Sequence, residues 1–262
     1  MAFDFTLEKY EELCTTLLNN GYRTITVCDY INELPHKGFC ILRHDVDRRP
    51  QNALRMAELE NGLGITSTYY FRYPYTFRPE VVSKIAGMGH EIGYHYETLA
   101  KASGDYGRAI RMFEHELEEM RKTADVRTIC MHGRPLSKHD NRDLWKVEDF
   151  RRFGLVAEAY LSIKNVRYFS DTGRSWNGKN NMRDFLCGQT NGSVSVDKTD
   201  EFIEYIKRQK PDRLYIVAHP ERWSAGILGL GQSYMKDLLF NIGKRMLRAF
   251  RRFEYGDCIG HK

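Results

Sequence analysis

Segments with strand character alternate with segments of helical character along most of this 262-residue chain. The strand-like segments are rich in β-branched and aromatic residues, and they cover residues 38–45, 65–73, 90–97, 126–133, 155–161, 166–173 and 213–220. The helical segments cover residues 6–21, 50–64, 78–89, 106–124, 141–154, 199–211 and 232–253. Such alternation is typical of a parallel α/β sheet or barrel.

Composition limits the class of protein. Apolar residues make up 42% and charged residues 29% of the chain, as in ordinary globular domains, and we expect one domain over residues 1–262. The net charge of +5 is too small to indicate nucleic-acid binding. The N-terminus has early acidic residues and no long apolar run, so we expect a cytoplasmic protein without a signal peptide. The six cysteines form no CxxC pair, which favours reduced thiols.

The C-terminal region concentrates the positive charge. Residues 232–262 contain seven basic and three acidic residues and so carry +4 of the net +5. The predicted helix at about 232–253 is amphipathic and basic. Two interpretations stay open: the helix caps the barrel, or it makes a peripheral contact with an anionic membrane surface.

Titratable side chains gather where the predicted strands end. Four of the nine histidines lie there, and the carboxyl ends of parallel strands are where such folds place their chemistry. The residues at or just beyond these ends are His44, Asp45, Asp47, Arg72, Tyr73, His95, Glu97, His132, Asp171, Arg174, Trp176 and His219.

The stretch "RHDVD" places two carboxylates two residues apart at the end of a strand. Asp45 and Asp47 therefore face the same side, where one can bind a metal ion and the other can accept a proton. Ion pairs with Arg43 and neighbouring arginines are the alternative. In "HEIGYHYE", strand alternation separates His95 from His90, and His95 is the better candidate for a metal ligand.

Three motifs carry a resemblance to a known family. "LRHDVD", "GHEIGYHYE" and "YIVAHPERW" occur in this order, and they resemble the polysaccharide deacetylase family (carbohydrate esterase family 4, NodB-type), in its Asp-Val-Asp branch. The resemblance implies a distorted (β/α) barrel with seven or eight mostly parallel strands over about residues 38–222. It also implies that Asp45 is the catalytic base, Asp47 and His95 are metal ligands, and His219 is the acid.

The sequence departs from the family pattern at one ligand position. Leu99 stands where a second metal-binding histidine is usual, so His132, Glu97 or solvent would complete the site. We take His132 as the candidate ligand. The candidate substrate-binding residues are Arg134, Asp171, Arg174, Trp176 and Arg222.

The resemblance implies a metal-dependent hydrolase that removes an N-acetyl group from an amino sugar. We expect a divalent ion, zinc first and cobalt, nickel or manganese as alternatives, and a carbohydrate substrate from a cell-surface glycan or its precursor. Another amide hydrolase on the same barrel is one alternative. A non-catalytic carbohydrate-binding relative is the other, and Leu99 is its main support. Metal binding separates the two hydrolases from the binding protein.

Overall fold

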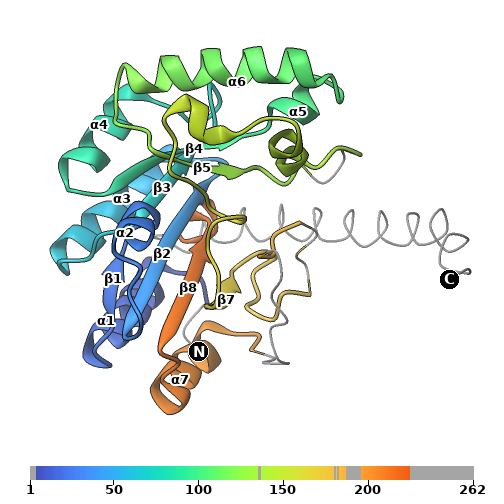
Figure 1. Ribbon diagram of the computed structural model, residues 1–262. Coiled ribbons are helices and arrows are strands. Elements are labelled where there is room, and N and C mark those ends of the chain that lie inside the picture. The colour runs from blue at the N-terminus through green and yellow to red at the C-terminus, as the bar shows by residue number, and fades with distance from the viewer. Residues whose placement is uncertain (1–3, 135–136, 180, 182, 187–195, 225–262) are drawn as a thin grey trace, which may run out of the picture.

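Eight strands, all paired in parallel, form the sheet in the part of the chain that the computed structural model describes. That part comprises residues 4–134, 137–179, 181, 183–186 and 196–224 (Figure 1). The strands are β1 Arg23–Ile25, β2 Phe39–Val46, β3 Thr68–Phe71, β4 Glu91–Tyr96, β5 Thr128–Met131, β6 Ala157–Glu158, β7 Arg167–Ser170 and β8 Arg213–Ala218.

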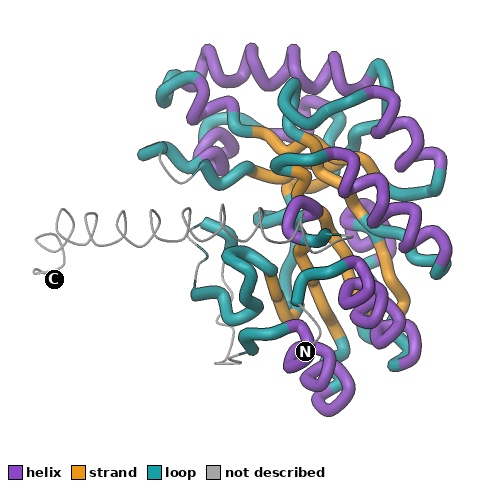
Figure 2. The backbone as a smooth tube through the Cα atoms, turned by 180° about the vertical axis from the view of Figure 1, so that it is seen from behind, coloured by secondary structure: helices purple, strands orange, loops and turns teal. Residues whose placement is uncertain are grey.

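The sheet curls into a half-barrel with helices along its outer side (Figures 1 and 2). Seven strands follow the order β6-β5-β4-β3-β2-β8-β7, and β1 pairs with β2 beside this path. No strand pairing joins β6 to β7 within the described residues, so the barrel is open there. This architecture confirms the predicted distorted α/β barrel.

The helices mostly follow the predicted segments. The α-helices are α1 Leu7–Asn19, α2 Val27–Glu33, α3 Pro50–Gly62, α4 Pro79–Gly87, α5 Thr98–Lys101, α6 Tyr106–Arg121 and α7 Thr199–Gln209. Short 3₁₀ helices are η1 Asn141–Lys146, η2 Phe150–Phe153 and η3 Pro220–Arg222. None of these described helices combines the length and the apolar character needed to cross a membrane.

Four elements differ from the prediction. The helix predicted over 141–154 is two 3₁₀ helices, because Asp140 and Asp149 each accept a bond from the backbone N–H two residues later and start a separate turn. Strand β1 and helices α2 and α5 were not predicted. A capping box of Thr26 and Asp29 begins α2 and is a recognisable signal. The predicted basic helix at 232–253 lies outside the described residues.

Strand alternation separates the two faces of β2. Arg43 and Asp45 point into the half-barrel, where the Arg43 guanidinium meets Tyr215 and Cys130 of other strands. His44 points outward and contacts Glu60 of α3 at 2.7 Å. Glu60 is fully buried and also accepts hydrogen bonds from Tyr10, Ser67 and Tyr69. Through Glu60, His44 therefore connects helices α1 and α3 to the outer face of the sheet. It does not reach the inside of the half-barrel.

The interior of the half-barrel requires glycine at one position of β4. A Cβ at Gly93 would lie 2.2 Å from Cε1 and 2.3 Å from Cδ1 of the Tyr70 ring. The ring is fully buried, and its hydroxyl is hydrogen-bonded to Thr128 at 2.8 Å. The motif "GHEIGYH" thus contains a glycine because an aromatic side chain of the neighbouring strand fills the space.

We expect Gly93→Ala to lower the free energy of unfolding by about 1–3 kcal/mol, since the added methyl group displaces the buried Tyr70 ring. Urea unfolding followed by circular dichroism measures the change. Gly87→Ala is the matched control, because a Cβ there meets nothing within 4 Å and alanine favours a helix. An equal effect of the two substitutions would contradict this account of Gly93.

Candidate functional site

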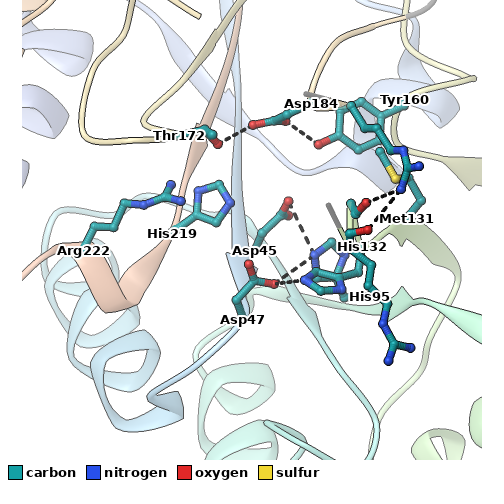
Figure 3. A pocket seen from close by; sticks show the side chains of 13 residues that line it. Asp45, Asp47, His95, Met131, His132, Tyr160, Thr172, Asp184, His219 and Arg222 are labelled. Carbon is teal, nitrogen blue, oxygen red and sulfur yellow. Dashed lines mark hydrogen bonds and ion pairs between the residues drawn. The ribbon is translucent and has the colours of Figure 1, made fainter. Parts of the chain in front are cut away.

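The carboxyl ends of the strands surround a cavity of about 90 Å³. Of the ten predicted site residues, seven line it (Figure 3): Asp45, Asp47, His95, His132, Arg134, His219 and Arg222. They come from β2 and the residue directly after it, from β4, from the loop after β5, and from the segment after β8, which includes η3. Strand ends that are far apart in the sequence therefore meet at one site, as the parallel sheet requires.

Three predicted substrate residues do not line the cavity. Trp176 is 2% exposed, stacks on Phe202 at 4.6 Å and donates its indole N–H to Thr199 at 3.1 Å. It belongs to the apolar core under α7, so no face of the indole is open to a sugar. The Arg174 guanidinium carbon lies 5.5 Å from the ring centroid of Phe5. Asp171 is fully buried behind His219.

The carboxylate of Asp47 faces two imidazole nitrogens. Its Oδ1 atom is buried and has no hydrogen-bond partner. The Nε2 atoms of His95 and His132 lie 3.3 and 3.4 Å from this oxygen. Neighbouring ligands of a tetrahedral ion with bonds of about 2.0–2.1 Å are roughly 3.3 Å apart. Each of these two distances matches the spacing of neighbouring ligands around a divalent ion.

Hydrogen bonds on the far side of each imidazole decide which nitrogen carries the proton. His95 Nδ1 lies 3.0 Å from the Cys130 carbonyl oxygen, and His132 Nδ1 lies 2.9 Å from the Glu97 carboxylate. Both partners only accept, so each Nδ1 donates its proton. In the neutral rings, both Nε2 lone pairs then face Asp47, and a cation would satisfy all three atoms. Such outer partners are usual for metal-binding histidines.

Glu97 orients His132 in this arrangement. Its other oxygen accepts a hydrogen bond of 2.8 Å from Arg72. Burial alone would raise its pKa, but His132 and Arg72 lower the pKa of Glu97 to about 2, so the carboxylate is ionised. Leu99, which stands at the position of the family's second histidine, is 1% exposed in the core on α5. His132, and not Leu99, faces Asp47.

A second group of side chains could also hold a metal ion. Ligand atoms of Asp45, His95 and Cys130 all lie within 4.8 Å of one another, and the three residues are buried. Arg43, however, donates to Cys130 Sγ at 2.7 Å and stays protonated inside the protein. Burial raises the pKa of the Cys130 thiol well above its usual range. Positive charge and a protonated thiol both oppose a cation there, so we favour the Asp47 group.

Asp45 is clamped by Arg43. The guanidinium donates to Oδ1 at 2.7 Å and to Oδ2 at 2.6 Å. Burial opposes ionisation of Asp45, but the charge of Arg43 outweighs it, so the pKa is lowered. The alternative foreseen for the two aspartates, an ion pair with arginine, thus holds for Asp45, while Asp47 faces the histidines.

His219 stands on the other side of the cavity and is fixed by Asp171. Its Nδ1 lies 2.6 Å from Asp171 Oδ1, and its backbone N–H donates to Oδ2 at 2.9 Å. Asp171 also accepts bonds from Arg222 and Trp223. Burial and Arg222 would lower the pKa of His219, but Asp171 raises it above the usual value. Asp171 therefore positions His219, and its predicted place in a sugar subsite does not fit its burial.

Two consecutive residues missed by the sequence analysis close the open side of the barrel. Asp184 accepts hydrogen bonds from four hydroxyl groups, those of Tyr160, Tyr168, Ser170 and Thr172, and Figure 3 shows it between Thr172 and Tyr160. Arg183 donates to the carbonyl oxygens of Gly133, Arg134 and Ser137. Side chains thus connect the loop after β5, the end of β6 and β7, where no strand pairing is described.

Solved structures with a similar fold include crystal structures of BA3943 from Bacillus anthracis, a CE4 family pseudoenzyme. The wild-type structure shares 15% identity and covers 78% of this chain with a TM-score of 0.45. A mutant with restored enzymatic activity shares 12% identity and covers 80% with a TM-score of 0.44. This chain spans 61% and 64% of the length of those two chains.

No family model and no curated protein sequence matches this chain. The structures found carry the name of the family that the three motifs resemble. Their TM-scores lie below 0.5, and the likeness carries no argument about activity or substrate. The chemistry of the site follows from the side chains of this protein.

Asp171→Asn is expected to lower the pKa of His219, because the neutral amide removes the negative charge that favours the imidazolium. The histidine Hε1 and Cε1 chemical shifts, followed by nuclear magnetic resonance against pH, measure this pKa. Asp212→Asn, at an exposed turn before β8, is the control and should leave it unchanged. An unaltered His219 pKa in Asp171→Asn would show that Asp171 does not hold the proton on this ring.

Proposed function

We propose that this protein is a metal-dependent hydrolase that removes an N-acetyl group from an amino sugar. The observation that carries the proposal is the convergence of Asp47 Oδ1 with the Nε2 atoms of His95 and His132. Asp45 lies beside this group, with its Oδ2 3.8 Å from His95 Nε2. His219 lines the same cavity from β8. Ligands, base and acid are thus available around one small polar cavity.

Asp47, His95 and His132 would hold a divalent ion, and zinc suits two imidazoles and one carboxylate. When bound, such an ion polarises a carbonyl group and makes water more acidic. The protein positions these ligands through Glu97 and the Cys130 carbonyl oxygen, which fix both imidazole rings.

Asp45 and His219 have complementary roles in this proposal. Arg43 keeps Asp45 ionised, and each carboxylate oxygen retains a second lone pair that can accept a proton from water. His219 has a raised pKa and is held through Nδ1, so its Nε2 can carry a proton to the departing amine. Asp171 fixes the ring and stabilises the imidazolium.

One observation favours the alternative of a non-catalytic carbohydrate-binding protein. Both oxygens of Asp45 are engaged by Arg43 at 2.6 and 2.7 Å, and the lowered pKa weakens this carboxylate as a base. A protein that binds acetylated sugars but releases no acetate would support this alternative over the hydrolase.

Wild-type protein should contain about one equivalent of zinc, cobalt, nickel or manganese, and Asp47→Ala and His132→Ala should lose it. Plasma mass spectrometry of the purified proteins measures the metal content. Asp200→Ala, an exposed aspartate of α7, is the matched control and should keep the metal. Metal retained in Asp47→Ala, or absent from the wild type after incubation with each ion, would refute the metal site.

Asp45→Asn should keep the metal and lose turnover by roughly 10²–10⁴-fold, the usual contribution of a general base. Acetate release from N-acetylglucosamine oligosaccharides, measured with and without a chelator, gives the rate. Wild-type activity should disappear with the chelator and return when the metal is added back. Full turnover in Asp45→Asn would exclude Asp45 as the base.

A further inference from the structure

Two exposed side chains belong to the segments that close the open side of the barrel, one lining the cavity and one directly after a lining residue. Arg134 lines the cavity, and its side chain is 44% exposed. Phe185 directly follows Asp184, a lining residue, and is 49% exposed. An exposed apolar residue is ordinary by itself. The two segments are joined, however, because Arg183, two residues before Phe185, donates to the Arg134 carbonyl oxygen.

Two other arginines fix the backbone around these residues. Arg183 donates to the carbonyl oxygens of Gly133 at 2.8 Å and of Arg134 at 3.2 Å. Arg142 donates to the Phe185 carbonyl oxygen at 3.3 Å, and its guanidinium carbon lies 4.9 Å from the ring centroid of Phe185. The rim is therefore held in place while the side chains of Arg134 and Phe185 stay exposed, which reduces the entropy lost when a ligand binds.

Among the described residues, the ion pair of Arg134 is a long one. Its NH1 atom lies 3.9 Å from Glu97 Oε2, which is beyond hydrogen-bonding distance. That oxygen already accepts from His132 at 2.9 Å, and the other oxygen of Glu97 accepts from Arg72. A guanidinium with five donors in a planar fork suits a carboxylate or a phosphate.

We propose that Arg134 and Phe185 form a subsite for an anionic sugar unit next to the N-acetylated one. The apolar face of the sugar ring packs on Phe185, and its carboxylate or phosphate pairs with Arg134. This inference deepens the proposed function and rests on it for the identity of the neighbouring N-acetylated unit. It predicts that the substrate is an acidic glycan or a phosphorylated amino sugar and not a neutral polymer.

Isothermal titration calorimetry with the 262-residue protein as purified tests the subsite without requiring turnover. The probes are a tetrasaccharide of alternating N-acetylglucosamine and glucuronate, the neutral tetramer of N-acetylglucosamine, N-acetylglucosamine 1-phosphate, and N-acetylglucosamine. At least one anionic probe should have an affinity about ten times that of its neutral counterpart, or higher. This is the contribution expected of one charge-assisted contact. A preference within the tetrasaccharide pair would indicate a carboxylate ligand. A preference for N-acetylglucosamine 1-phosphate over N-acetylglucosamine would indicate a phosphate ligand.

Arg134→Gln should abolish this preference and leave the affinity for neutral probes unchanged. Phe185→Ser should lower the affinity for every probe that the wild type binds. The controls are Arg208→Gln, an exposed arginine of α7, and Tyr106→Ser, an exposed aromatic residue of α6, and both should behave as wild type. Metal content should be unchanged in all four variants.

Equal affinity for anionic and neutral probes, or a preference that survives in Arg134→Gln, would overturn the subsite. The subsite would also be overturned if neither anionic probe bound at concentrations up to about 10 mM. A specific subsite should bind its ligand with a Kd below that concentration. Acetate release is measured in parallel. Anionic preference without acetate release would refute only the proposed hydrolysis, whereas acetate release without this preference would refute only the subsite.

Discussion

A buried ion pair at the centre of the half-barrel determines how the rest of the site is arranged. Arg43 is fully buried and holds both oxygens of Asp45. An isolated charge in such a place would be very unfavourable, and the guanidinium is further accommodated by the hydroxyl of Tyr215 and by the ring of Tyr160, 4.3 Å from its carbon. Because a permanent cation occupies the interior and disfavours a metal ion there, the metal site that we propose lies farther out, beside Asp47.

The same pair explains the different environments of the two aspartates in "HDVD". Asp45 lies on β2, deep enough to meet Arg43, while Asp47, directly after the end of β2, reaches the imidazoles of β4 and of the loop after β5. One carboxylate is satisfied by a protein cation. The other has a buried oxygen without a hydrogen-bond partner, and a bound metal ion would give this oxygen a partner.

Closure of the barrel and recognition at its rim depend on the same short segment. Asp184 and Arg183 connect β7, the end of β6 and the loop after β5 through hydrogen bonds of their side chains. Strand pairing would have filled this side with backbone. Side-chain closure leaves Arg134 and Phe185 exposed, and the subsite that we propose lies at this opening in the sheet.

The sequence by itself determined the parallel α/β architecture, and it determined that Asp45, Asp47, His95, His132 and His219 meet at one edge of the sheet. Both follow from local periodicity and from the rule that parallel strands end on the same side. Only the tertiary structure decided which side chains contact one another around these residues. The pairing of Asp171 with His219, the four hydroxyl groups around Asp184 and the burial of Trp176 join segments that no local pattern connects, because these contacts depend on how the loops fold back over the sheet.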